Sequence, residues 1–200
     1  MMQSYIFQQL AEKGRADGID DQVRQKDTRT WFRTAAQKIK NVNTSRMMRE
    51  ENSNITKIKR TDIGKMVMFF YDPKTKKDLP YYDTFPLIFP LTFYNDGFLG
   101  INLHYLPPIL RAKLMNALYQ TINNRKYDDT TKLKISYDIL NSASKYKFFT
   151  PCVKRYLWTH VRSHFLVIEP RMWDAALMLP TERFKKDTKQ NVWLDSQGMI

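Results

Sequence analysis

The chain has 200 residues and a formal net charge of +13, with 33 Lys or Arg against 20 Asp or Glu. This length supports one domain with a hydrophobic core, and an apolar share of 42% excludes a disordered chain. The cationic excess favours polyanionic partners, either nucleic acid or acidic protein surfaces. A basic subunit that acidic neighbours neutralise is the alternative to a nucleic-acid binder.

The cysteine content and the hydropathy of the sequence indicate the cellular compartment in which the protein folds. Cys152 is the single cysteine, which rules out an internal disulfide and is typical of a protein folded in a reducing cytoplasm. No apolar run reaches the roughly 18 residues of a membrane span. The first residues lack the basic and apolar regions of a signal peptide, so we expect no membrane partner.

Residues 1–62 are predicted to form a helical and basic N-terminal arm. Within it, Trp31, Ala35 and Ile39 recur at the spacing of one helix face, which predicts a helix over 28–40.

Most of the net charge lies in this arm. From Arg24 to Arg60, eleven Lys or Arg stand against three acids, a local net charge of +8. The stretch 41–60 has few large apolar residues and no Pro or Gly. We therefore predict an extended or partly ordered segment that becomes ordered on a partner, with a solvated linker as the alternative.

Residues 63–200 are predicted to form an α+β body whose β-meander occupies 63–106. The predicted strands are 63–71, 85–94 and 98–106. Pro86 and Pro90 cannot donate to a β-ladder, so the second strand is expected at an edge, bent or broken. The sequence Asn95-Asp96-Gly97 predicts a tight turn.

Residues 107–200 are predicted to be helical. Apolar stripes predict helices after Pro107, after Asp129 and after Glu169. Thr150-Pro151 is typical of a helix start. The apolar residues that follow predict one face of a single long helix: Val153, Leu157, Val161 and Phe165. The expected fold is α+β, with a small antiparallel barrel-like sheet, a helical C-terminal half and a basic N-terminal arm.

Residues with catalytic or metal-binding potential are few. Cys152 is expected to be a buried side chain, and His160 and His164 lack further metal ligands at suitable spacing. Four carboxylates of the central region, Asp72, Asp78, Asp83 and Asp96, lie at turns, which explains them without catalysis. We predict no enzyme, no metal, no cofactor and no small-molecule ligand, and a nuclease using Asp72 and Asp83 is the third hypothesis.

Ten aromatic residues lie between Phe69 and Phe98, and the charged segment 74–77 lies among them. Such a set provides either a stacking platform for single-stranded nucleic acid or a core with a protein interface. The second interpretation is the more common one.

Several stretches resemble a family of proteins encoded by large contractile-tailed phages of the T-even type. They are FFYDPKTKKDLPYYDTFPLIFPL, NDGFLGINLHYLPP, NNRKYDDTT, RYLWTHVRSHF and VWLDS, and the similarity runs from about Trp31 to the C-terminus. The resemblance implies a small virion component of the tail, baseplate or neck, made in the host cytoplasm. It implies no catalytic residues.

The leading hypothesis is a structural virion subunit that docks on acidic neighbouring phage proteins through its basic arm. The alternative is a nucleic-acid-binding protein that holds phage DNA ends or assists packaging, with a steep salt dependence. The candidate partner-binding residues are Arg24, Arg29, Trp31, Arg33, Lys38, Lys40, Arg46, Arg49, Lys57, Lys59, Arg60, Tyr81, Tyr82 and Trp193.

Overall fold

The computed structural model describes residues 7, 9, 10, 13, 25–50, 54–122, 126, 128–143 and 147–198. Its helices are α2 (Gln25–Gln37), α3 (Thr44–Glu50), α4 (Pro108–Ile122), α5 (Asp129–Ala143), α6 (Trp173–Met178) and α7 (Lys189–Gly198). Its strands are β1 (Asn54–Ile55), β2 (Met66–Met68), β3 (Tyr82–Asp83), β4 (Leu87–Tyr94), β5 (Gly97–Asn102), β6 (Val153–Leu157), β7 (Phe165–Ile168) and β8 (Phe184–Lys185). The α+β class is confirmed.

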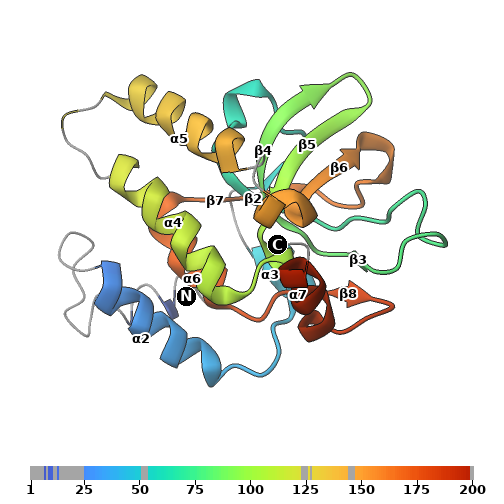
Figure 1. The fold of residues 1–200 in the computed structure, drawn as a ribbon, viewed down its shortest axis with the longest axis horizontal. Coiled ribbons are helices and arrows are strands. Elements are labelled where there is room, and N and C mark those ends of the chain that lie inside the picture. The colour runs from blue at the N-terminus through green and yellow to red at the C-terminus, as the bar shows by residue number, and fades with distance from the viewer. Residues whose placement is uncertain are drawn as a thin grey trace.

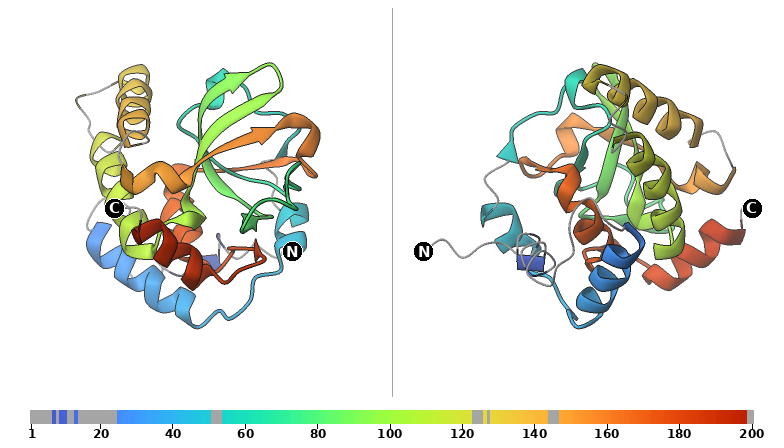
Figure 2. Two further views of the ribbon diagram at one scale, coloured as in Figure 1. Left: turned by 45° about the vertical axis from the view of Figure 1, so that its right-hand side comes forward. Right: turned by 90° about the vertical axis from the view of Figure 1, so that its left-hand side faces the viewer.

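Six strands form one antiparallel sheet in the order β1-β7-β2-β4-β5-β6, and β3 pairs with β8 in a separate two-stranded ribbon. The sheet is open, because β1 and β6 lie at opposite ends of the order and do not pair. The expected barrel-like closure is therefore wrong. Helices α4 and α5 lie on one side of this sheet, and the β4–β5 hairpin projects away from them (Figures 1 and 2).

Alternation along the strands separates two cores. Met66 and Met68 of β2 join the main core together with apolar residues of α4 and α6. Val67, between them, joins a smaller and largely aromatic core on the opposite face of the sheet. In this second core the ring of Phe69 lies 5.3 Å from that of Tyr156. The sheet thus buries both faces, one with helices and the other with aromatic side chains of its own strands.

The β4–β5 hairpin confirms the predicted tight turn, because Tyr94 pairs with Gly97 across Asn95-Asp96. A Cβ at Gly97 would lie 1.9 Å from the Tyr156 carbonyl oxygen, so the approach of β6 requires glycine there. β4 tolerates Pro90 because β2 pairs with β4 only as far as Ile88, and the register shifts between Pro90 and Thr92.

The long helix expected from Pro151 is wrong. Residues 147–152 form a 3-10 helix, and β6 and β7 follow in place of the helix. β6 completes the ladder of β5, and Tyr156 stacks on Phe98 with ring centroids 5.2 Å apart. A helix here would leave the hydrogen-bonding edge of β5 and the ring of Phe98 uncovered, which explains why the strand is favoured.

The basic segment is folded onto the body. The predicted stripe of Trp31, Ala35 and Ile39 packs against the main core, and α2 contacts α6. The stretch expected to be extended contains α3, whose Met47 is completely buried. Arg24 lies outside the described residues. The division of the chain at residue 62 stays a prediction.

No helix among the described residues is long and apolar enough to cross a membrane.

Candidate nucleic-acid interface

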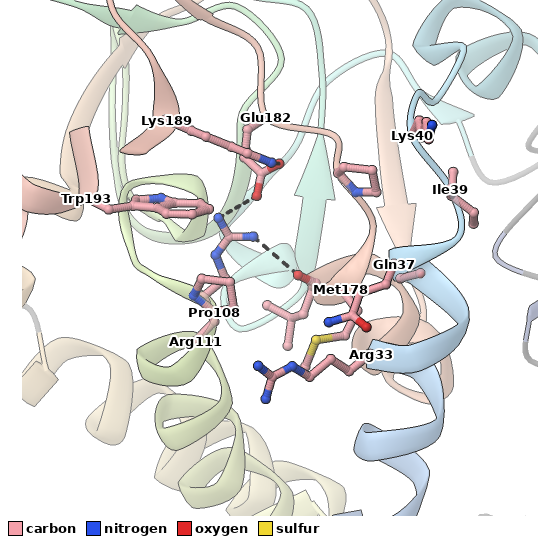
Figure 3. Close-up of a pocket in the computed structure, with 13 residues that line it drawn as sticks. Arg33, Gln37, Ile39, Lys40, Pro108, Arg111, Met178, Glu182, Lys189 and Trp193 are labelled. Carbon is pink, nitrogen blue, oxygen red and sulfur yellow. Dashed lines mark hydrogen bonds and ion pairs between the residues drawn. The ribbon is translucent and has the colours of Figure 1, made fainter. Parts of the chain in front are cut away.

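The structure brings three of the predicted partner-binding residues to one pocket. Arg33 and Lys40 come from α2 and the residues after it, and Trp193 comes from α7 (Figure 3). This Trp193 pocket has a volume of about 370 Å³. In Figure 3 the side chains of Arg33 and Gln37 lie on one side of Met178. The indole of Trp193 lies on the other side.

The inner wall of the Trp193 pocket is a buried ion pair. The Arg111 guanidinium contacts the Glu182 carboxylate at 2.6 Å and donates to the carbonyl oxygens of Leu106 and Leu177. It lies 5.5 Å from the centroid of the Trp193 ring. Burial raises the pKa of Glu182, but the charges of Arg111, His104 and Lys189 together bring it down to about 2. This acid is therefore ionised and neutralises Arg111.

The rim of the Trp193 pocket has cations without acids. Arg33 and Lys40 are exposed and form no ion pair with any residue that the structure describes. A neighbouring pocket of about 420 Å³ shares Glu182 and Lys189 with this one and adds two cations, Arg183 and Lys185, and one acid, Asp187. Within the described ranges, these two side chains also lack an ion-pair partner. We call the cations of these two pockets the basic strip, which consists of Arg33, Lys40, Arg183, Lys185 and Lys189.

A second pocket receives Tyr81 and Tyr82. Its volume is about 350 Å³, and its aromatic lining consists of five tyrosines: Tyr71, Tyr81, Tyr82, Tyr105 and Tyr156. The cations that line it are Lys74, Lys154 and Arg155. We call it the tyrosine pocket. It adjoins the basic strip, because Tyr82 of β3 pairs with Lys185 of β8, and directly opposite residues share one face of a ribbon.

The floor of the tyrosine pocket is held by a buried polar network. The Asp83 carboxylate contacts His104 Nδ1 at 2.7 Å and accepts from the Asn102 side chain at 3.1 Å. His104 Nε2 lies 3.1 Å from the Thr181 hydroxyl, and the His104 carbonyl oxygen accepts from Trp193 Nε1. This network connects β3, β5, α7 and the segment before β8, and so fixes both pockets relative to each other.

The order Thr181–His104–Asp83 resembles a catalytic triad, yet all three residues are buried, with Thr181 only 1% exposed. No substrate reaches this hydroxyl in the folded protein. The other acid of the nuclease hypothesis, Asp72, is engaged by Lys76 at 2.8 Å. The sequence order and local turns gave no sign that Asp83 pairs with His104.

Cys152 is buried, and burial raises the pKa of its thiol to about 12. The thiol is therefore protonated at neutral pH and is a poor nucleophile. His160 and His164 do not share a helix face, because this segment is a 3-10 turn and a loop. Among the described residues no cluster of three His, Cys, Asp or Glu could hold a metal.

The aromatic run divides between core and surface. Phe69, Phe85, Phe89 and Phe98 are completely buried. Tyr94 is 46% exposed and lies under the Arg155 guanidinium, at 3.7 Å. Only Tyr81 and Tyr82, with Tyr71, come from this run to the tyrosine pocket. The core interpretation therefore holds for the buried rings, whereas base stacking on the pocket tyrosines stays a prediction.

The remaining candidate residues lie outside these two pockets. Trp31 faces the main core, and the Lys57 ammonium lies 5.2 Å from the Trp158 ring. The exposed side chains of Lys38, Arg46, Arg49, Lys59 and Arg60 line neither pocket. Of Arg29, the structure describes only the helical backbone.

Sequence reasoning missed Lys154, Arg183, Lys185 and Lys189. Lys154 falls outside the apolar stripe of the helix expected from Pro151, and no local pattern singles out Arg183, Lys185 or Lys189. The pattern Val-Lys-Arg-Tyr-Leu at 153–157, with its β-branched and aromatic residues, was the available signal for a strand.

Lys and Arg clustered on one surface are typical of proteins that bind polyanions. Within that class, the chain belongs to the family described as phage T4 terminal DNA protecting protein, which it matches over residues 7–196. That description names protection of DNA and no catalysed reaction. No curated protein and no solved structure gives a significant match.

The family corrects one expectation. The resemblance to phage proteins is supported, but placement in the tail or baseplate is wrong, because the matching family is one of terminal DNA protection.

Proposed function

We propose that this protein binds the ends of linear phage DNA and protects them from degradation. The observation that carries the proposal is the family match over residues 7–196, a family named for terminal DNA protection. The net charge of +13 and the clustered cations of the basic strip support it. The protein acts by occupying the terminus, with no bond made or broken, and travels with the DNA in the virion.

In this proposal the basic strip contacts the phosphates of the duplex near its end. Arg and Lys contacts to phosphate supply affinity without sequence preference, which suits a terminus of any sequence. Arg183 and Lys185 lie beside the tyrosine pocket, so the strip directs the end of the duplex toward it. The buried pair of Arg111 and Glu182 holds the segments that present these cations.

Protection of linear duplexes from a processive exonuclease tests this function. Short and long duplexes are compared at equal concentrations of ends, and the same duplexes with covalently closed hairpin ends serve as DNA controls. We expect the protein needed for half-protection to follow the number of ends and not the mass of DNA. A requirement that scales with total length would show coating of the duplex and would overturn the proposal.

A matched pair of variants connects protection to the basic strip. Arg183→Ala combined with Lys185→Ala removes two cations of the strip, and we expect at least a tenfold loss of end affinity, about 1.4 kcal/mol or more. Lys113→Ala combined with Lys134→Ala removes the same charge from exposed positions on α4 and α5. Equal losses in both variants would contradict a role for the strip.

A further inference from the structure

Lys154 is a cation without an anion. Its side chain is partly buried in the tyrosine pocket, where its ammonium lies 4.2 Å from the centroid of the Tyr105 ring. It forms no hydrogen bond or ion pair with any residue that the structure describes, whereas its neighbour Arg155 pairs with Asp96. Burial lowers the pKa of Lys154, because the pocket removes water from the charged form. An anionic group entering the pocket would supply the missing partner.

Cross-strand pairing leaves this ammonium accessible. Lys154 lies directly opposite Gly100 of β5, which has no side chain to place over it. Asp83, the acid in the described lining, is already engaged by His104 and Asn102. No carboxylate of the described lining therefore neutralises Lys154, and its positive charge is available to a ligand in the pocket.

Tyr82 supplies a ring for stacking. Tyr81 contacts the rings of Tyr105 and Phe184, and Tyr71 contacts Tyr156. Tyr82 is half-buried and, within the described part of the chain, contacts no other aromatic ring. Stacking of a base on such a ring is tolerant of sequence.

The volume of the tyrosine pocket limits the size of the ligand that fits in it. At about 350 Å³ the tyrosine pocket is at the lower end of the range for small-molecule sites, too small for a duplex and suited to one nucleotide. We propose that the tyrosine pocket holds a single unpaired nucleotide at the DNA terminus, with its phosphate on Lys154 and its base on Tyr82. This inference rests on the proposed function for its DNA context, but the pocket itself binds the nucleotide.

The first test uses a mononucleotide and needs no DNA end. Deoxyadenosine 5′-monophosphate is titrated into protein with ¹³C-labelled tyrosine rings, and the Tyr82 resonance is assigned from its loss in Tyr82→Phe. We expect the Tyr82 resonance to shift in the wild type and not in Lys154→Met. Deoxyadenosine lacks the phosphate. We expect it to need at least a tenfold higher concentration than the mononucleotide to give half of the maximal Tyr82 shift. Equal titrations of wild type and Lys154→Met would overturn the inference.

The second test compares DNA ends. We expect the wild type to bind a duplex with one unpaired terminal nucleotide about tenfold more tightly than a hairpin-closed duplex, and Tyr82→Leu to lose that preference. Overhangs with a 5′-phosphate, a 5′-hydroxyl or a 3′-terminal nucleotide distinguish a terminal phosphate from an internucleotide one. Lys134→Met is the charge control. Melting temperatures establish that each variant is folded.

The two proposals fail separately. Exonuclease protection without any Tyr82 shift or preference for an unpaired nucleotide would retain end protection and overturn the pocket. A nucleotide-dependent Tyr82 shift without exonuclease protection would retain the pocket and overturn end protection.

Discussion

Arg111 is 1% exposed, and Glu182 is the acid that neutralises it, at 2.6 Å. Taking either charge out of water is costly, and removal of one partner leaves the other buried and unpaired. The same guanidinium donates to backbone carbonyl oxygens of Leu106 and Leu177, so it also connects η2 (Leu103–Tyr105) and α4 to the end of α6. A single residue thus fixes the wall shared by the Trp193 pocket and the basic strip.

The substitution Glu182→Gln is expected to lower the free energy of unfolding by about 3 kcal/mol at pH 7. The folded pKa of Glu182 is about 2 and its ordinary value is 4.5, so the contribution of this carboxylate is complete above pH 4.5. It is lost as the pH falls from 4.5 toward 2. Urea unfolding of wild type and variant across this range measures the difference.

Asp138→Asn, at an exposed position of α5, is the control for loss of one carboxylate. Its unfolding free energy is expected to stay within about 0.5 kcal/mol of the wild type. A difference between wild type and Glu182→Gln that stayed constant down to pH 2.5 would show that the ion pair does not stabilise the fold.

At the scale of elements, α2 shows how a charged segment becomes part of a body. Its apolar stripe was visible in the sequence as Trp31, Ala35 and Ile39, and that stripe packs on the main core. Ala36 is 4% exposed beside it. Arg33 on the exposed side of α2 and Lys38 directly after its end lie in solvent. Packing of one face therefore presents the cations of the other in a fixed orientation.

Limited trypsin digestion tests this docking. We expect cleavage after Lys74, Lys76 or Lys77, in an exposed turn, to precede cleavage after Arg33 or Lys38. Ala36→Glu places a charge against the core and is expected to release α2, so that Arg33 and Lys38 are cut first. Mass spectrometry identifies the sites in order.

Thr34→Glu adds the same charge on the exposed side of α2 and is expected to leave the cleavage order unchanged. Early cleavage at Arg33 in the unmodified protein would restore the prediction of a loose arm that orders on a partner.

At the scale of the whole molecule, only some of the cations behind the net charge of +13 are available to a partner, because others are paired with acids. Arg155 pairs with Asp96, Lys76 with Asp72 and Arg111 with Glu182. The basic strip keeps most of its charge because four of its five members form no ion pair with a described residue, although Asp187 lines the same pocket as Arg183 and Lys185. Net charge alone could not distinguish these two groups.

DNA binding is expected to weaken steeply with salt. Each phosphate contact contributes about 0.9 to the magnitude of the slope of log K against log salt concentration. Arg33→Ala combined with Lys40→Ala is therefore expected to reduce the magnitude of this slope by about 1.8. Lys134→Ala is expected to leave the slope unchanged. Fluorescence anisotropy of a labelled duplex at several salt concentrations measures both, and an unchanged slope in the double variant would place Arg33 and Lys40 outside the interface.

The sequence by itself determined the elements whose signals are local. The stripe of α2, the Asn95-Asp96-Gly97 turn, the helix after Pro107 and the excess of cations all follow from neighbouring residues. Such signals need no knowledge of distant contacts.

Only the tertiary structure decided the strands β6 and β7, the pairing of Asp83 with His104, and the position of Lys154. Val153, Leu157 and Val161 satisfy a helical spacing, yet the open edge of β5 and the ring of Phe98 make the strand more favourable. The two pockets join residues up to 160 positions apart, such as Arg33 and Trp193. Which cations lack acids depends on these distant contacts, and a linear pattern does not contain them.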